Sequence, residues 1–185
     1  MTATAALKRM FSSSALKMER SFLCSDGVQI AAQHWRGGDD DARHKILCLH
    51  GWLDNCRSFH LLAPELCSLD TQVVALDFPG HGLSSHKSPD APPTVMSDAV
   101  FYVKETVAQL EWNSFVLVGH SMGAAISLIF AAAFPEQVEK LVLLEGAGPL
   151  TRKAEDVAKH VRASVERRQA GNPLLYPRFC GNGSK

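Results

Sequence analysis

The sequence of 185 residues has no excess of charge of either sign, because 19 Lys and Arg residues balance 19 Asp and Glu residues. A domain that binds nucleic acid usually carries a basic surplus, so this balance argues against nucleic acid as a partner. The sequence also lacks a run of about 20 apolar residues, the length that crosses a bilayer as a helix. We therefore expect no membrane span.

The cysteines are scattered along the chain. The five cysteines form no Cys-x-x-Cys pair and no Cys/His arrangement with zinc-site spacing: Cys24, Cys48, Cys56, Cys67 and Cys180. An odd number of dispersed cysteines is typical of reduced thiols in an intracellular protein. We expect an intracellular location, cytoplasmic or mitochondrial, and neither a metal nor another cofactor.

Residues 1–20 differ in composition from the rest of the chain. They contain several basic residues and a run of three serines, with no acidic residue before Glu19. This composition is similar to that of a mitochondrial presequence, and a disordered tail explains it equally well. In either case we expect the fold to begin at residue 21. The predicted organisation is a disordered or targeting segment over 1–20, a core over 21–150 and a final region over 151–185.

From residue 21 onward, strand patterns alternate with helical ones. After a predicted hairpin over 21–35, apolar runs typical of buried parallel strands lie at 45–50, 72–78, 115–118 and 140–144. Helical patterns lie between and after them, at 59–67, 96–112, from 124 to 134, and at 151–169. This alternation predicts an α/β fold, a mostly parallel sheet with helices on both faces.

The most informative stretch joins the strand at 115–118 to the helix after it. It reads Gly119-His120-Ser121-Met122-Gly123, with the serine between two glycines. Neighbours without bulk allow a sharp turn that pushes the hydroxyl clear of the sheet, next to the free N–H groups of a helix N-terminus. Gly-x-Ser-x-Gly alone is a weak pattern, but the strand and helix around it make Ser121 a candidate nucleophile.

Two further motifs precede this turn, and each follows a predicted strand: Leu49-His50-Gly51-Trp52, and Asp77-Phe78-Pro79-Gly80-His81-Gly82-Leu83-Ser84. In this order the three motifs resemble the α/β-hydrolase superfamily, and the stretch over 47–55 resembles its serine hydrolase-like branch. The resemblance covers about residues 21–150. It implies that Ser121 is the nucleophile and that the backbone N–H groups of Trp52 and Met122 form an oxyanion hole. It also implies that the helix from Thr151 begins a lid.

The histidines near these motifs are weaker catalytic candidates. His50 ends a strand before the oxyanion loop, and we expect it to order that loop. His81 and Asp77 belong to a glycine-rich turn and are expected to shape it. His120 adjoins Ser121, but successive side chains on a turn point in different directions.

The acid and the base of a catalytic triad are harder to place. By the resemblance, Glu145 is a candidate acid because it follows the strand after the nucleophile, and Asp156 is a weaker candidate. The superfamily places its catalytic histidine on a loop after the last strand. After Ser121 this sequence has one histidine, His160, and it lies within a predicted helix. We therefore expect a chain that is C-terminally truncated relative to the fold, with the last strands missing.

Two hypotheses about function follow. The first is a serine hydrolase of ester or thioester acyl substrates, impaired in this chain because no C-terminal histidine is present. The alternative is an inactive fragment or pseudoenzyme that only binds a ligand or partner. Halide or epoxide chemistry on the same fold needs a carboxylate nucleophile, so Ser121 argues against it.

Two expectations concern partners. Trp52, Met122 and Phe78 are expected to form the floor of an apolar pocket, which favours a small-molecule substrate with a hydrophobic acyl chain. The apolar strand at 141–144 is expected to lie at the edge of the sheet. An exposed edge of this kind invites pairing with another chain, so we expect self-association.

Overall fold

The computed structural model describes residues 15–38, 42–86 and 96–146, together with positions 156, 159 and 162. The chain divides into two compact units, residues 1–149 and residues 150–185. In the second unit, Asp156, Lys159 and Arg162 are helical and exposed. This agrees with the helix predicted over 151–169, whose remaining positions and His160 lie outside the described residues.

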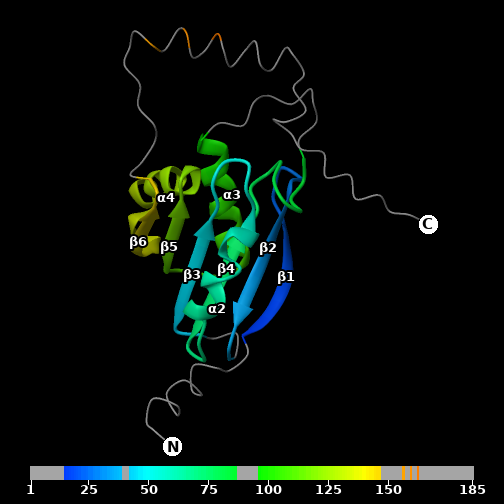
Figure 1. Ribbon diagram of the computed structural model, residues 1–185, viewed down its shortest axis with the longest axis vertical. Helices are drawn as coiled ribbons and strands as arrows, with labels where there is room; N and C mark the ends of the chain where they lie inside the picture. The colour runs from blue at the N-terminus through cyan, green and yellow to red at the C-terminus, as the bar shows by residue number, and fades with distance from the viewer. Residues whose placement is uncertain are drawn as a thin grey trace, which may run out of the picture. The chain divides into compact units, whose positions relative to one another are not determined.

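The first unit is built on a six-stranded sheet with the strand order β1-β2-β4-β3-β5-β6 (Figure 1). The strands are β1 (Leu16–Leu23), β2 (Gln29–Arg36), β3 (His44–Leu49), β4 (Thr71–Leu76), β5 (Phe115–His120) and β6 (Val138–Leu144). β2 pairs antiparallel with β1 and with β4. The pairs β3–β4, β3–β5 and β5–β6 are parallel. The predicted mostly parallel α/β fold is confirmed.

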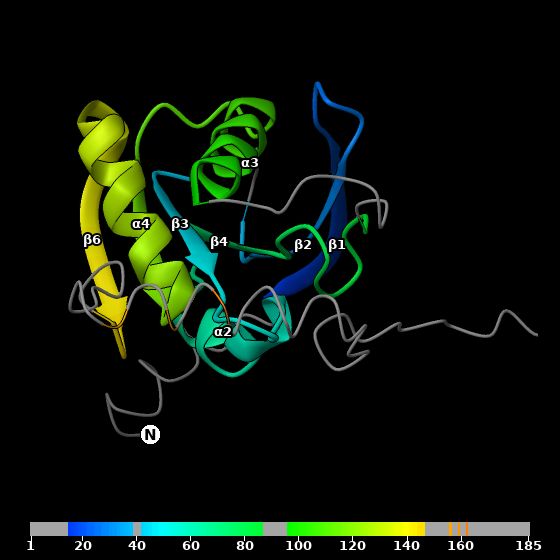
Figure 2. The same ribbon diagram turned by 90° about the horizontal axis from the view of Figure 1, so that it is seen from above.

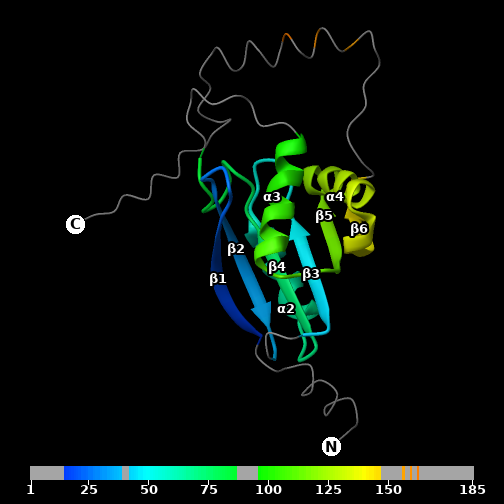
Figure 3. The same cartoon turned by 180° about the vertical axis from the view of Figure 1, so that it is seen from behind.

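Helices cover both faces of this sheet. α3 (Met96–Gln109) and α4 (Met122–Ala133) pack on one face, and η1 (Cys56–Phe59) and α2 (Leu62–Leu66) pack on the other. The short helix η2 (Pro135–Gln137) leads into β6. Seen from above, α3 and α2 lie on opposite sides of the strands (Figure 2). Seen from behind, α3 lies in front of the sheet (Figure 3).

The core is divided into two layers by the alternation of side chains along the strands. Leu47 and Leu49 of β3 point toward α3 and α4, whereas Cys48 between them points toward η1 and α2. β4 follows the same rule and is buried from Gln72 to Leu76. Burial on both faces explains why β3 and β4 read as continuous apolar runs in the sequence.

β1 begins at Leu16, five residues earlier than the predicted start of the fold, and residues 16–20 pair with β2. Residues 16–20 therefore belong to the sheet and not to the segment set apart at 1–20. Two basic residues of this strand lie over aromatic rings, Lys17 over Trp35 at 6.0 Å and Arg20 over Phe22 at 5.3 Å. Charged side chains are usual on an edge strand. The basic residues of β1 are part of the reason why residues 1–20 resemble a targeting segment in composition.

Helix boundaries also differ from the prediction. The helix predicted at 59–67 is two short ones, η1 and α2, and Pro64 occupies the first turn of α2, where an N–H would have no partner inside the helix. α3 ends at Gln109, three residues before the predicted end, and Glu111 then has a positive φ of 57°. Within the described ranges, no helix combines the length and apolar character that crossing a membrane requires.

Candidate active site

Ser121 lies between the end of β5 and the first turn of α4, in an unusual backbone conformation. Its φ is 50° and its ψ is −110°, a combination that a residue with a side chain rarely adopts. Such geometry costs on the order of 1–3 kcal/mol and persists only where the surroundings enforce it. The Ser121 N–H donates to Leu144 O of β6 at 2.9 Å, which ties the turn to the neighbouring strand.

The two glycines of the motif are required by close contacts. A Cβ on Gly119 would lie 2.5 Å from Ser127 Oγ in α4 and would also collide with the Gly123 carbonyl oxygen. A Cβ on Gly123 would collide with the carbonyl of Leu49 and would lie 2.7 Å from His50 O. The helix therefore packs directly on the backbone at the end of β3, and Ser121 is held where that strand ends.

Two backbone N–H groups are available beside Ser121. Met122 is the first residue of α4, so its N–H has no acceptor within the helix. Trp52 follows Gly51, and the position of a Cβ on Gly51 would lie 3.4 Å from Ser121 Cβ. Neither N–H donates a hydrogen bond to any described residue. They are the two donors that the resemblance described above implies for an oxyanion hole.

His50 orders the loop that carries Trp52, as expected. Its Nε2 accepts a hydrogen bond from Phe78 N–H at 3.0 Å, so Nδ1 carries the proton and donates to Gly51 O at 2.7 Å. His50 is fully buried, and this burial lowers its pKa to about 4. A neutral imidazole with both nitrogens bonded cannot take a proton from Ser121 without losing a hydrogen bond.

Asp77 joins the same loop to the segment after β4. Its carboxylate accepts from Cys56 N–H at 2.6 Å and from Leu83 N–H at 2.8 Å. Its backbone carbonyl accepts from Ser84 Oγ at 2.7 Å. The carboxylate also occupies the space that a Cβ on Gly82 would take, and Gly82 has a φ of +51°. Asp77 therefore shapes the glycine-rich turn, in agreement with the prediction.

His81 forms a second bridge between the two loops. Its Nε2 accepts from Leu53 N–H at 3.3 Å, and its Nδ1–H donates to Pro79 O at 3.1 Å. Its ring lies edge-on to the Trp52 ring, with 5.8 Å between centroids. Leu53 has a φ of 57°, so this loop also contains a strained residue. The sequence showed the histidine but gave no sign of the strain at Leu53.

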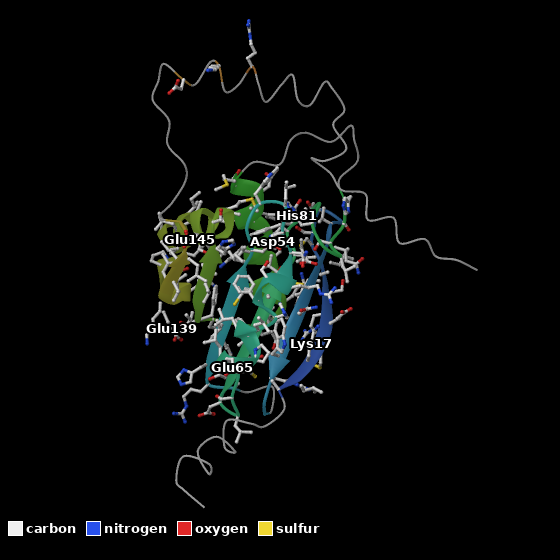
Figure 4. All side chains as sticks on the ribbon, viewed as in Figure 1. Lys17, Asp54, Glu65, His81, Glu139 and Glu145 are labelled. Atoms are coloured by element: carbon white, nitrogen blue, oxygen red, sulfur yellow. The ribbon has the colours of Figure 1, made fainter. Side chains whose placement is uncertain are left out.

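The predicted acid, Glu145, follows β6 directly. His120 pairs with Leu144 in the β5–β6 register, so Ser121 and Glu145 are the next residues at the ends of neighbouring strands. Glu145 has a φ of 50°, the same as Ser121. Figure 4 shows Glu145 at the same end of the sheet as Asp54 and His81, whereas Glu139 lies farther down β6.

Gly146 is a site residue that the sequence motifs missed. A Cβ on Gly146 would lie 3.0 Å from Ala124 Cβ and 3.1 Å from Ser121 O, so this glycine packs against the serine turn. A glycine two residues after a strand was the only signal. Phe78 and Trp52, both expected in the floor of an apolar pocket, differ in exposure. The Phe78 ring is buried and packs edge-on against His50, whereas Trp52 is 58% exposed.

The model of the alpha/beta hydrolase fold family matches residues 45–173. A serine hydrolase-like protein from Dictyostelium discoideum is 38% identical over 161 residues, which cover 85% of this chain and 44% of that protein. A human serine hydrolase-like protein is 49% identical over 100 residues, covering 54% of this chain and 48% of the human one. The chain thus spans less than half the length of these relatives.

Two solved structures are also similar. A hypothetical protein from Pseudomonas aeruginosa superposes with a TM-score of 0.71 at 35% identity, covering 82% of this chain and 51% of that one. A thioesterase domain from the curacin biosynthetic pathway gives a TM-score of 0.68 at 25% identity, covering 83% of this chain and 52% of that one. Both contain about twice the length that matches.

Proposed function

The chain belongs to the alpha/beta hydrolase fold family, and on this premise we propose that it supplies the nucleophile and oxyanion hole of a serine hydrolase acting on ester or thioester acyl substrates. The observation that carries the proposal is the strained turn at Ser121, with the N–H groups of Trp52 and Met122 beside it, neither of which is bonded to a described residue. Glycine would relieve that strain, so the presence of serine there supports a functional role.

The proposed chemistry is acyl transfer in two steps. Ser121 Oγ attacks the acyl carbonyl carbon, its proton passes to a base, and the carbonyl oxygen becomes an oxyanion that receives the Trp52 and Met122 N–H groups. The alcohol or thiol leaves with that proton, and water then hydrolyses the acyl-serine to the free acid. One preorganised donor of this kind contributes roughly 3 to 4 kcal/mol to the stabilisation of the transition state.

For the acid we propose Glu145. Its position beside Ser121 in the β5–β6 register and its positive φ support this role. Replacing Glu145 by Gln is expected to slow the acylation of Ser121, because a neutral amide supports a charged base less well. Glu139→Gln, a change on the same strand but away from Ser121 (Figure 4), is the matched control. Equal rates for the two variants would rule out this assignment.

The catalytic base is the member of the triad for which the histidines of this chain give the least support. His50 and His81 are committed to hydrogen bonds in the loops, and His160 is the one histidine that follows Ser121 in the sequence. We therefore expect the 185-residue polypeptide on its own to turn over substrate slowly. An oxyanion hole and substrate binding without a base still give about 10³- to 10⁴-fold acceleration over water. A polypeptide that binds an acyl ligand without hydrolysing it is the alternative.

The substrate class draws support from one similar structure, the thioesterase domain named above. The test is hydrolysis of a series of acyl esters and acyl thioesters of increasing chain length by the folded polypeptide. We expect slow hydrolysis that Ser121→Ala abolishes and that Ser114→Ala, a change just before the other end of β5, leaves unchanged. Hydrolysis that survives Ser121→Ala would contradict the proposal, and binding without hydrolysis would favour the alternative.

We further propose that two copies of the chain associate through β6. In the described sheet β6 pairs with a strand on one side only, and Val142 and Leu144 are 40% and 37% exposed on the same face. A long apolar edge of this kind favours strand pairing between chains. Light scattering at increasing concentration should show dimers, and Val142→Lys should reduce them. Monomers throughout the range would contradict this proposal.

A further inference from the structure

His120 is a residue of the serine turn to which the proposed chemistry assigns no role. It ends β5, its side chain is half-buried, and it extends to the face of the sheet that carries Val118 and not to the α4 face. No described residue forms a hydrogen bond with its imidazole. Its ring instead packs against the backbone of the loop that carries Trp52, the oxyanion loop.

That contact is with Gly51. A Cβ on Gly51 would lie 3.0 Å from His120 Nδ1 and 3.3 Å from His120 Cε1. Such distances are shorter than ordinary van der Waals contact between carbon atoms or between carbon and nitrogen. The imidazole therefore occupies the space beside the Gly51 Cα, and glycine is the residue that allows it to lie there.

Gly51 is consequently held from two directions. On one side its carbonyl accepts the hydrogen bond from His50 Nδ1–H at 2.7 Å. On another side its Cα rests against the His120 ring, beside Ser121 Cβ. The next N–H along the chain is that of Trp52, and fixing the Gly51 peptide unit on both sides fixes the direction of that N–H.

We propose that His120 is a positioning residue, whose imidazole packs against Gly51 and thereby sets the Trp52 N–H at its place in the oxyanion hole. The proposal deepens the function proposed above and rests on it for its catalytic consequence. A displacement of about 1 Å in such a site can cost on the order of 100-fold in rate. The His120–Gly51 contact itself is independent of whether the polypeptide turns over.

The test is a double-mutant cycle of Gly51→Ala and His120→Ala, with His120→Phe to keep a flat ring and His44→Ala, an exposed histidine at the start of β3, as control. The first readout is the rate at which a fluorophosphonate labels Ser121. Each single change is expected to slow labelling about tenfold, because each displaces the loop. In the His120→Ala background, Gly51→Ala should cost at least about threefold less than it does alone, since the added methyl then has space.

The second readout is the backbone amide signal of Trp52 in a ¹H–¹⁵N spectrum, which needs no activity. It is expected to move in both single variants, to return toward the wild-type position in the double variant and in His120→Phe, and to stay in place in His44→Ala. If the wild-type chain is not labelled but the Trp52 signal follows this pattern, the proposed function fails and the positioning role stands. An unmoved Trp52 signal in His120→Ala, or strictly additive effects, would overturn the inference.

Discussion

The two halves of the site are held in place by opposite means. On the β3–β4 side, the side chains of His50, Asp77 and His81 bridge the loops with hydrogen bonds. On the β5–β6 side, the strained backbone at Ser121 packs against Gly51 and Gly146, Glu145 also has a positive φ, and the described residues form no such bridges there. The first half should therefore be sensitive to the loss of side-chain atoms as well as to additions at Gly51 and Gly82, and the second chiefly to additions.

The largest effect is expected where an atom is added. In Gly123→Ala the new Cβ would collide with the carbonyls of Leu49, the last residue of the central strand β3, and of His50, the buried residue that follows it. We expect a loss of more than about 4 kcal/mol in the free energy of unfolding, beyond the usual 1–3 kcal/mol for an overpacked core. Urea unfolding followed by circular dichroism measures it.

Gly27→Ala is the control for that prediction. Gly27 has a φ of +83° and no atom within 4 Å of an added Cβ, so only backbone strain opposes the change. A cost of about 1 kcal/mol is expected there. Similar costs for the two variants would show that close packing around the serine turn is unimportant.

The second-largest effect is expected on the β3–β4 side, where side-chain hydrogen bonds join the loops. Asp77→Ala would leave the buried N–H of Cys56 without its acceptor and would remove the acceptor of the more exposed Leu83 N–H, at a cost of about 2 kcal/mol to the free energy of unfolding. Asp77→Asn keeps one acceptor oxygen and should recover part of the loss. If Asp77→Ala unfolds at the same urea concentration as the wild type, the carboxylate does not hold these loops together.

The third prediction concerns pH. The folded-state pKa of His50 is about 4, below its ordinary value of 6.5, so between these pH values the unfolded chain binds more protons. The contribution of His50 to stability is complete above pH 6.5 and falls, by at most about 3 kcal/mol, as the pH decreases toward 4. Comparing the wild type with His50→Gln in urea unfolding at several pH values isolates this contribution. Parallel pH profiles would contradict the neutral buried imidazole.

The smallest expected effect is a gain in stability from glycine, which usually lowers the free energy of unfolding relative to alanine. Ser121→Gly should raise the free energy of unfolding by about 1 kcal/mol relative to Ser121→Ala, because glycine adopts a φ of 50° without strain. Thermal unfolding of the two variants gives the difference directly. A less stable glycine variant would mean that the serine turn carries no stored strain.

The sequence predicted the elements and the serine turn well, for physical reasons. Strands buried on both faces, such as β4, leave continuous apolar runs, and the Gly-x-Ser-x-Gly pattern records two steric requirements that the structure confirms at Gly119 and Gly123. The edge strand β1 was placed too late because its charged residues resemble a targeting segment.

What the sequence could not show is contact between distant residues. The Asp77 carboxylate reaches Cys56 across 21 positions, and the Nε2 of His50 reaches Phe78 across 28. Neither pairing has a local pattern. The positive φ at Leu53 and Glu145 is likewise hidden, because nothing distinguishes those residues in sequence from ordinary loop positions.

We propose that Ser121 is a nucleophile beside a preformed oxyanion hole. The most direct measurement is the mass of the folded polypeptide after treatment with a fluorophosphonate, with peptide mapping of the modified residue and Ser121→Ala beside it. We expect one adduct, on Ser121, which the variant lacks. A folded chain that gains no adduct, or that is modified equally in Ser121→Ala, would contradict it.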